Sequence, residues 1–396
     1  MDIQLANRVK RIKPSPTLAV TQRAAQLAAS GHDIVGLGAG EPDFDTPAHI
    51  KEAAINAIKQ GKTKYTAVEG ILSLRTAIAE KMKRFNNLNY TPDQIIVSTG
   101  GKQCIYNLFQ AVLDAGDEVI IPAPYWVSYP DMALLADATP VFVQTDIQHR
   151  FKILPEQLEA AITPRTKMFV LNSPSNPTGM SYTAKELAAL AEVLLQHPHV
   201  LIATDDMYEH IQWSKEPFCN LVMACPDLYD RTIVLNGVSK AYAMTGWRIG
   251  YACAPTSIIK PMNKIQSQST SNPCSISQAA AEAGLRGDQS FLNEMVTVFK
   301  QRHDYLVGEL NKIDGIQCAQ GDGTFYAFAR VQDIINRMPD INSDTQLAEH
   351  LINTVGLALV PGSAFGTEGF MRLSFATNME TLEKAISRLK TALSAS

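Results

Sequence analysis

Short apolar runs alternate with longer amphipathic stretches through the middle of the chain. The runs are rich in β-branched residues, as buried strands are, and the stretches between them repeat apolar positions with the period of a helix. The strand-like runs lie at 94–100, 167–174, 200–206, 231–237 and 246–254, and the helical stretches at 102–116 and 184–198. This alternation predicts an α/β fold with a large, doubly wound, mostly parallel sheet covered by helices on both faces. Ligands bind such sheets at the carboxyl ends of the strands.

The pattern changes after the middle of the chain. The stretch 290–312 predicts one long helix that leads out of the large domain. The strand patterns GTFYAFARV, LALVPG and GFMRLSFAT then alternate with the helical patterns SDTQLAEHLINTVG and ETLEKAISRLKTAL. We therefore expect a large domain at 48–290 and a smaller α+β domain formed by both chain ends, 1–47 and 291–396.

Composition narrows the kinds of function. The chain has 396 residues, 46% of them hydrophobic, and a formal net charge of -4, which disfavours nucleic acid and anionic membranes as partners. No window reaches the roughly 18 apolar residues of a membrane span, and MDIQLANRVKRIKP at the start lacks the apolar core of a secretory signal. The six cysteines form no CxxC pair, which indicates reduced thiols and no metal site. We expect a cytoplasmic protein that acts on small molecules.

Two glycine-rich segments are candidate sites for close approach of a ligand. GLGAGEPDFDTP at 36–47 has GxGxG spacing and prolines where a helix would begin, so it fails as a dinucleotide fingerprint and is better interpreted as a tight turn. STGGKQ at 98–103 lies between a strand pattern and a helix pattern, where backbone N–H groups attract an anion. A phosphate cradle and a plain strand-to-helix turn are equally compatible with this segment alone.

Polar residues follow two further strand patterns. NSPSNPTG at 172–179 has the composition of an ordinary turn. ATDDMYEH places Asp205, Asp206 and Tyr208 at the end of the next strand. Paired acids suggest a metal site, but no histidine cluster accompanies them. A buried aspartate there is better explained by a cationic partner.

The segment VSKAYAMTGWRIG at 238–250 holds two cations among small and apolar residues. Desolvation disfavours the ammonium form of a lysine, so Lys240 is a candidate nucleophilic amine that forms a Schiff base. A lysine whose amine reaches solvent is the alternative. The neighbouring strand-end motifs favour the nucleophile.

These motifs together resemble a known family. NSPSNPTG, the aspartate and tyrosine of DDMY, SKAYAMTGWRIG and RLSFA occur in the order seen in the class I pyridoxal-phosphate aminotransferases of the aspartate aminotransferase fold. With AGEPDFDTP, GKTKY, GGKQ and PYWVSYP included, the chain is most similar to the bacterial aspartate aminotransferases, some of which also transaminate prephenate. The resemblance covers essentially the whole chain. It implies the pyridoxal-phosphate-dependent transferase fold type I, in which the large domain binds the cofactor.

The resemblance assigns roles around the cofactor. Lys240 would hold pyridoxal 5'-phosphate covalently and move the proton during catalysis. Arg248 would pair with the phosphate, together with N–H groups of Gly101 and Lys102. Asp205 would keep the pyridine nitrogen protonated, which makes the ring an electron sink.

Further cofactor contacts follow from the same resemblance. Tyr208 and Asn176 would bind the phenolic oxygen of the ring, and Trp126 would stack on its face. Tyr65 resembles a tyrosine that reaches the phosphate in the neighbouring subunit. The resemblance therefore implies a homodimer with shared active sites.

Substrate contacts are implied as well. Arg372 would grip the α-carboxylate as a bidentate fork, beside the Gly40 backbone. Lys102 and Lys13 match lysines that are associated with the distal carboxylate of acidic substrates, and a solvated surface lysine is the alternative for each. Trp126 and Asn176 would line the same substrate pocket.

Two positions depart from the family pattern. Many relatives carry a hydroxyl residue where this chain has Gly237, which leaves a phosphate contact by Ser239 in doubt. The family motif SGAFY is here DGTFY, beginning at Asp322, a change that a turn could accommodate.

The expected reaction is ping-pong transfer of the amino group of L-aspartate to 2-oxoglutarate, giving oxaloacetate and L-glutamate. The alternatives are a prephenate or an aromatic or neutral amino-acid aminotransferase of the same family, and a β-lyase that uses the same cofactor. A non-catalytic module of a DNA-binding regulator is disfavoured, because the resemblance begins near residue 1.

Overall fold

The computed structural model describes residues 3–394; the four terminal residues of the predicted smaller domain, 1–2 and 395–396, lie outside the described range. The largest sheet has seven strands in the order β2-β8-β7-β6-β5-β3-β4. These strands are β2 (Ile95–Ser98), β3 (Glu118–Ala123), β4 (Thr139–Gln144), β5 (Thr166–Asn172), β6 (Leu201–Asp205), β7 (Thr232–Gly237) and β8 (Gly250–Cys253). Pairing is parallel from β7 to β4, and β8 alone runs antiparallel to its two neighbours β2 and β7.

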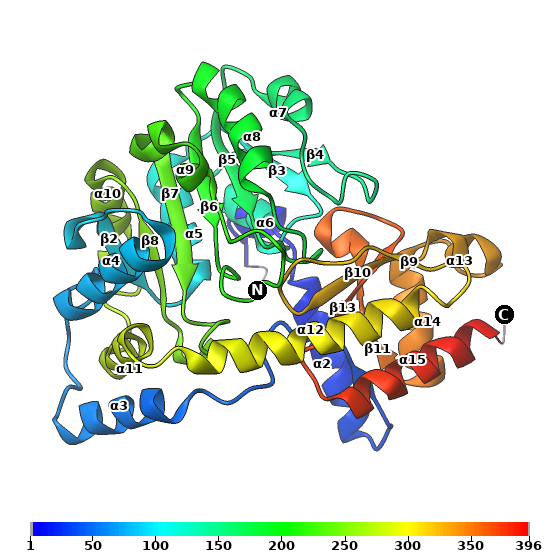
Figure 1. Ribbon diagram of the computed structural model, residues 1–396. Helices are drawn as coiled ribbons and strands as arrows, with labels where there is room; N and C mark the ends of the chain where they lie inside the picture. Colours follow the sequence, from blue (N-terminus) through cyan, green and yellow to red (C-terminus); the bar gives the residue numbers. More distant parts are fainter. Residues whose placement is uncertain (1–2, 395–396) are drawn as a thin grey trace.

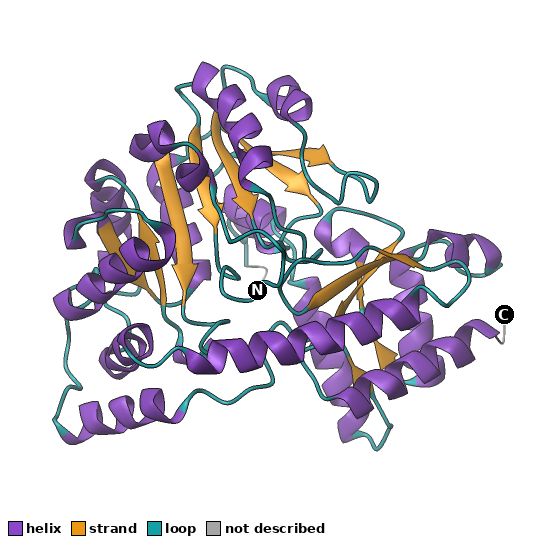
Figure 2. Ribbon diagram, viewed as in Figure 1, coloured by secondary structure: helices purple, strands orange, loops and turns teal. Residues whose placement is uncertain are grey.

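Helices pack against both faces of this sheet, as Figure 2 shows for the orange strands between purple helices. One face packs with α5 (Gly101–Val112), α6 (Ser128–Leu135) and α10 (Thr256–Ser267). The other packs with α7 (Pro155–Ala161), α8 (Ala184–Gln196) and α9 (Leu221–Ala224). At its β2–β8–β7 side the second face also packs with α4 (Leu72–Asn86). Helix α11 (Ser275–Arg286) packs on α4, and α3 (Ala48–Lys59) packs on α11. Burial on both sides explains why the strands are apolar without alternation.

Two smaller sheets lie beside the large one. The first is antiparallel, in the order β12-β13-β10-β9, and the second pairs β1 with β11 in parallel. Their strands are β1 (Val35–Gly36), β9 (Gln317–Cys318), β10 (Tyr326–Arg330), β11 (Leu357–Ala358), β12 (Val360–Pro361) and β13 (Phe370–Ser374). Their helices are α13 (Gln332–Arg337), α14 (Asp344–Val355) and α15 (Met379–Ser394). Because β1 comes from the start of the chain and β11 from its end, the two chain ends build this part together.

One long helix links the two parts. Helix α12 (Ser290–Leu310) runs in Figure 1 from beneath the large sheet to the smaller sheets, and this confirms the helix predicted at 290–312 to within two residues. Helix α2 (Pro16–Ala29) packs beside β1, β11 and β12, and the short α1 (Asn7–Arg11) lies against α6. In the described part of the chain four 3-10 turns complete the elements: η1 (Pro92–Gln94), η2 (Pro226–Arg231), η3 (Thr245–Trp247) and η4 (Gly362–Phe365).

The register of the large sheet brings the predicted strand-end motifs together. Asn172 pairs with Asp205, and Asp205 pairs with Leu235, so β5 and β6 end at the same level and β7 continues two residues further, to Gly237. The segments that follow these ends contain Asn176, Tyr208 and Lys240. No helix between residues 3 and 394 is long and apolar enough to cross a membrane. In the same range no three His, Cys, Asp or Glu side chains gather in an arrangement that could hold a metal ion.

Candidate active site

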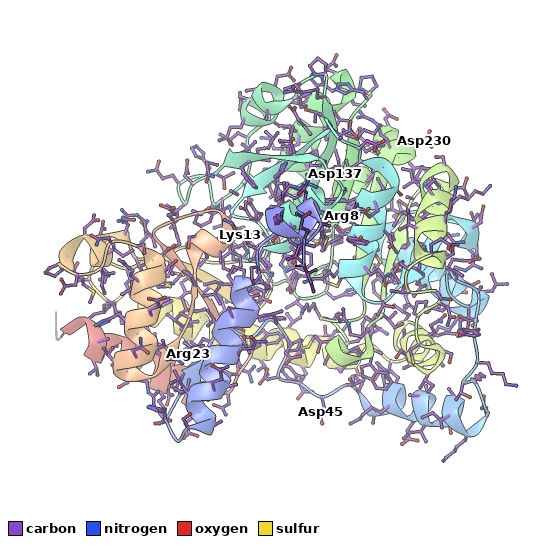
Figure 3. The ribbon with its side chains drawn as sticks, turned by 180° about the vertical axis from the view of Figure 1, so that it is seen from behind. Arg8, Lys13, Arg23, Asp45, Asp137 and Asp230 are labelled. Carbon is purple, nitrogen blue, oxygen red and sulfur yellow. The ribbon has the colours of Figure 1, made fainter. Side chains whose placement is uncertain are left out.

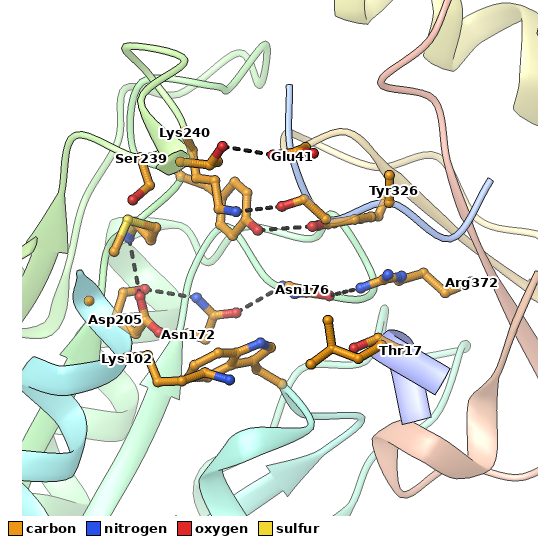
Figure 4. A pocket seen from close by; sticks show the side chains of 18 of the residues that line it. Thr17, Glu41, Lys102, Asn172, Asn176, Asp205, Ser239, Lys240, Tyr326 and Arg372 are labelled. Atoms are coloured by element: carbon orange, nitrogen blue, oxygen red, sulfur yellow. Dashed lines mark hydrogen bonds between the residues drawn. The ribbon is translucent and has the colours of Figure 1, made fainter. Parts of the chain in front are cut away.

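A pocket of about 410 Å³ opens at the carboxyl ends of the central strands, between the large sheet, helix α2 and the small antiparallel sheet (Figure 4). Most of the residues predicted from the sequence line it: Gly40, Gly101, Lys102, Trp126, Asn176, Asp205, Tyr208, Lys240, Arg248 and Arg372. They come from both chain ends and from the middle, so folding is what brings them together. Tyr65 and Lys13 do not line this pocket.

Lys240 follows β7 and points its amine into the pocket. Its Nζ donates a hydrogen bond of 2.5 Å to the carbonyl of Gly40. It forms no ion pair within 4.0 Å among the residues of the described chain. Although the side chain lines an open pocket, removal of water by the surrounding protein lowers the pKa of Lys240 to about 8, against the opposing charge of Glu41. A lysine in this setting is available as a neutral, nucleophilic amine near neutral pH.

Asp205 ends β6 and is 7% exposed. Its carboxylate accepts hydrogen bonds from the Tyr129 hydroxyl at 2.5 Å and from the Met207 backbone at 3.3 Å. Burial raises the pKa of Asp205, and the opposing effects of the Tyr129 hydrogen bond and the Lys240 charge do not reverse that shift. A cationic N–H group placed against this carboxylate would favour its ionised form.

The turn before α5 makes an anion-binding corner with Arg248. Gly100 has a φ of 83°, and a Cβ there would lie 2.3 Å from an Arg248 guanidinium nitrogen, so both the turn and the arginine require glycine. Helix α5 begins at Gly101, and its first N–H groups have no partner within the helix. The guanidinium of Arg248 is exposed and donates to the Thr245 carbonyl at 2.8 Å. Such a corner suits a phosphate or another anion.

Lys102 lies in the first turn of α5, on the same side of the pocket. Its Nζ lies 5.1 Å from the centre of the Trp126 ring, a cation–π arrangement. Burial, together with the nearby Arg248 charge, lowers the pKa of Lys102 below its ordinary value.

Arg372 forms the opposite wall, from strand β13. It is 2% exposed, and its guanidinium donates to the Asn176 side chain at 3.0 Å and to the Gly38 carbonyl at 2.8 Å. The guanidinium carbon lies 4.4 Å from the centre of the Tyr326 ring. Its Nε has no hydrogen-bond partner among the residues that the structure describes. A buried guanidinium that meets only neutral groups is a strong attractor for an external carboxylate.

A line of hydrogen bonds connects the two ends of the pocket. The Asn172 side chain donates to the Asp205 carbonyl at 2.9 Å and accepts from the Asn176 backbone at 2.8 Å, and Asn176 in turn accepts from Arg372 (Figure 4). The hydroxyl of Tyr208 lies 3.2 Å from that of Tyr326. The polar groups of the pocket are therefore held in fixed relative positions.

Two predicted residues lie elsewhere. The side chain of Tyr65 is 92% exposed, well outside the pocket of its own chain. Lys13 lines a separate hollow of about 800 Å³ bounded by α2, α6 and α14, and its backbone N–H donates to Asp131 at 3.3 Å. Figure 3 shows Lys13 in the view from behind. The roles that the resemblance implies for Tyr65 and Lys13 stay predictions.

Several residues of the pocket were not predicted as contacts. They are Thr17, Glu41, Asn172, Ser239, Thr245 and Tyr326, and Tyr129, which does not line the pocket, contacts Asp205. Tyr129 and Tyr326 belong to the motifs PYWVSYP and DGTFY, but nothing local indicates that they reach Asp205 and Tyr208. The departure at Gly237 has a physical reason, because a Cβ there would lie 3.0 Å from the Ile249 carbonyl and 3.2 Å from the Met207 methyl group.

Comparison with known proteins gives a consistent result. The sequence profile of "aminotransferase class I and II" matches residues 32–389. A protein of Nitrosomonas europaea called aspartate/prephenate aminotransferase is 58% identical, over 99% of this chain and 100% of its own. The crystal structure of an aspartate aminotransferase from Rhizobium meliloti has a TM-score of 0.96 at 47% identity and covers 99% of both chains. The Thermus thermophilus aspartate aminotransferase with maleate has a TM-score of 0.93 at 43% identity, covering 99% of this chain and 100% of that one.

Proposed function

Because the chain belongs to the class I and II aminotransferases, we propose that it moves the amino group of L-aspartate to 2-oxoglutarate. The reaction has two halves: L-aspartate leaves as oxaloacetate, and 2-oxoglutarate then leaves as L-glutamate. One observation carries the proposal. A lysine with a lowered pKa, Lys240, and a buried arginine without an acidic partner among the described residues, Arg372, face one pocket of about 410 Å³.

The residues of this pocket fit pyridoxal 5'-phosphate, the cofactor of this family. The corner formed by Gly100, Gly101 and Arg248 suits its phosphate, and the buried carboxylate of Asp205 suits its ring nitrogen. Lys240 would hold the aldehyde carbon, Trp126 would lie against the ring face, and Tyr208 and Asn176 would meet the phenolic oxygen. When bound, the cofactor supplies an aldehyde for amino groups and a ring that withdraws electrons from the substrate α-carbon.

Residues of the protein would then bind and orient the substrate and move its proton. Once the substrate amine has displaced it from the aldehyde carbon, the freed Nζ of Lys240, whose pKa is lowered to about 8, would accept the proton of the substrate α-carbon. Arg372 would bind the α-carboxylate by two parallel hydrogen bonds, which orients the α-carbon toward Lys240. The Gly40 carbonyl, which accepts from Lys240 at 2.5 Å, would lie against the same substrate. Asp205 would hold a proton on the cofactor's ring nitrogen.

A substrate with an acidic side chain fits the positive charge that Lys102 contributes to the pocket. Lys102 lies beside Trp126 and Arg248 on the wall opposite Arg372, where it can meet a distal carboxylate. The Thermus thermophilus relative was crystallised with maleate, which is a dicarboxylate. Prephenate also carries two carboxylates and a 2-oxo group, and the Nitrosomonas europaea relative is named for both substrates. We propose prephenate as a second amino acceptor.

The proposed assembly is a homodimer with shared active sites. The exposed Tyr65 ring, which does not line its own pocket, supports this arrangement, since a tyrosine that reaches a neighbouring phosphate must leave its own chain. Lys13 is proposed as a second contact to the distal carboxylate. It borders the hollow on the far side of α2 from the pocket, so the proposal requires its side chain to move.

Amino-donor profiling tests the proposed function. With 2-oxoglutarate as acceptor, we expect kcat/KM for L-aspartate to exceed that for L-alanine by roughly 10²-fold, because a distal carboxylate gains a charge-assisted contact. Aspartate no better than alanine would remove aspartate as the substrate. Pyruvate released from a cysteine-like donor without any acceptor would indicate the β-lyase instead.

A further inference from the structure

A buried polar cluster lies behind the pocket, under the segment that carries Asp205 and Tyr208. Its members are Lys81 and Asn86 from α4, Glu209 from the turn after β6, and Asn236 from β7, and each is at most 6% exposed. None of these four lines the pocket. Their role is therefore not contact with substrate or cofactor.

Glu209 is the centre of this cluster. One carboxylate oxygen accepts from the Lys81 ammonium and from the Asn236 amide at 2.9 Å. The other accepts from the Asn86 amide at 2.8 Å, and Asn86 accepts from Lys81 at 2.9 Å. Every charged group of the cluster thus has partners of opposite charge or a hydrogen bond.

The cluster joins the two segments that hold the proposed catalytic groups. Glu209 lies in the turn that follows Asp205, and its backbone N–H donates to the Asp206 carbonyl at 3.0 Å. Asn236 lies on the strand that leads to Lys240, and its side chain accepts from the Gly237 backbone at 2.7 Å. One side-chain hydrogen bond, from Asn236 to Glu209, therefore connects the segment of the ring-nitrogen acid to the segment of the reactive lysine.

Packing alone does not account for this cluster. Taking a lysine and a glutamate out of water costs more than their attraction usually returns, and well-packed apolar residues of similar volume are often at least as stable. Burial alone would raise the pKa of Glu209, but the Lys81 charge and the hydrogen bonds lower it to about 2, so the carboxylate remains an acceptor at neutral pH. His210 faces the same carboxylate at 3.3 Å, and burial lowers its pKa. What the apolar alternative lacks is the directional bond to Asn236.

We propose that Glu209 and Asn236 are positioning residues that hold Asp205 and Lys240 at their working separation on the cofactor, an inference that rests on the proposed function. Lys81 and Asn86 keep Glu209 ionised and correctly oriented. Lys240 would hold the aldehyde carbon of the cofactor and Asp205 would hold its ring nitrogen, so a shift of either segment would weaken both contacts.

The test begins with Asn236→Leu, which removes the link and leaves Lys81, Asn86 and Glu209 paired. We expect the dissociation constant for pyridoxal 5'-phosphate to rise about tenfold, with a shifted visible absorbance of the Lys240 Schiff base and a lower kcat. The reason is that the side-chain link is lost, and only backbone bonds such as that from the Asp206 N–H to the Leu235 carbonyl at 2.9 Å still join the two segments. The matched control is Thr232→Val on the same strand. Thr232 is fully buried and donates to the Leu228 carbonyl at 2.8 Å, at the end away from Lys240.

A second pair of variants separates positioning from stability. Lys81→Met/Glu209→Gln keeps an acceptor for Asn236, whereas Lys81→Met/Glu209→Leu removes it, and neither leaves a buried unpaired charge. We expect the first to bind the cofactor within about threefold of the unchanged protein and the second to lose about tenfold, as Asn236→Leu does. Adding Asn236→Leu to the second variant should cause little further loss of cofactor affinity, since the bond between Asn236 and Glu209 is already broken and only the Gly237 N–H loses a further partner.

The outcomes distinguish the two proposals. An unchanged protein that gives no Schiff-base absorbance with pyridoxal 5'-phosphate contradicts the proposed function. If that absorbance is present but Asn236→Leu changes only the free energy of unfolding, as Thr232→Val does, the positioning role is wrong. Equal cofactor affinity in the Gln and Leu double variants would overturn it as well.

Discussion

Lys81 on helix α4 and Lys240 after strand β7 differ in their partners. Lys81 is 1% exposed, and its ammonium is paired with Glu209 and bonded to Asn86. Among residues 3–394, Lys240 donates only to the Gly40 carbonyl, and the surrounding protein lowers its pKa to about 8. The partners decide the role: an acid beside a buried lysine keeps it charged and structural, whereas a lysine without that acid stays close to its neutral, reactive form.

The largest effect is expected at the unpaired lysine. Lys240→Ala should lower the rate of transamination from L-aspartate by at least about 10⁴-fold, because it removes both the covalent anchor and the group that moves the proton. The free energy of unfolding of the cofactor-free protein should stay within about 1 kcal/mol, since no ion pair is lost. Single-turnover kinetics and urea unfolding measure the two quantities. A variant that retains a rate near that of the unchanged protein would contradict the assignment.

The paired lysine should behave in the opposite way. Lys81→Met should lower the free energy of unfolding by about 3–5 kcal/mol, because it leaves the Glu209 charge buried without its partner. Adding Glu209→Leu should recover most of that loss. Urea unfolding at neutral pH measures both.

The dependence of the free energy of unfolding on pH is a second test of the pair of Lys81 and Glu209. The folded-state pKa of Glu209, about 2, lies below the ordinary value, so its contribution is present above the unfolded pKa of about 4.3 and is lost as the pH falls toward 2. The Lys81→Met/Glu209→Leu variant should lack this part of the decrease in stability at acid pH. A Lys81→Met protein as stable as the unchanged one would show that the pair does not hold the fold.

Arg372 is a third cation to compare with Lys81 and Lys240. Arg372 is bonded to the neutral groups of Asn176 and Gly38, which leaves its charge available to a substrate. Arg372→Lys should lower kcat/KM for L-aspartate by about 10²-fold, because an ammonium cannot reproduce the two-pronged contact. The control is Arg330→Lys on β10 of the same sheet, where the arginine pairs with Asp333 near the surface. Equal effects of both substitutions would contradict a substrate contact at Arg372.

The smallest effect is expected at an exposed pair. Arg150, whose side chain is 41% exposed, pairs with Asp322 at 2.8 Å, and Asp322 is the residue that departs from the family motif. Arg150→Ala should lower the free energy of unfolding by less than about 1 kcal/mol and leave kcat/KM unchanged, because water screens the pair. A loss of unfolding free energy as large as that of Lys81→Met would contradict the expectation that the exposed ion pair stabilises the fold less than the buried one.

Sequence patterns predicted the fold well where local chemistry carries the information. The period of apolar residues indicated the strands, but β8 runs antiparallel, and an apolar strand has the same pattern in either direction. The strands β1 and β9 have two residues each, too few for any periodicity. The predicted strand LALVPG is divided in the structure between β11 and β12, which belong to different sheets.

The residues of the site also divide into those that a local sequence pattern indicates and those that it does not. Lys240 and Asp205 stand out locally, as a cation among small residues and an acid at a strand end. The Tyr129 contact to Asp205 and the Lys81 pair with Glu209 join residues 76 and 128 positions apart, and no local signal reports such distances. At Gly237 the sequence showed only a difference from the family motif. The structure supplies a reason for the glycine, because Ile249 and Met207 lie close to the position of a Cβ atom there.

The most direct measurement is to locate the lysine that bonds the cofactor. The protein is incubated with pyridoxal 5'-phosphate, reduced with borohydride and digested, and the labelled peptide is identified by mass spectrometry. The account predicts a label on Lys240 whose formation rate rises with pH to a midpoint near the pKa of about 8. A label on Lys81, Lys102 or another lysine, or no label at all, would contradict it.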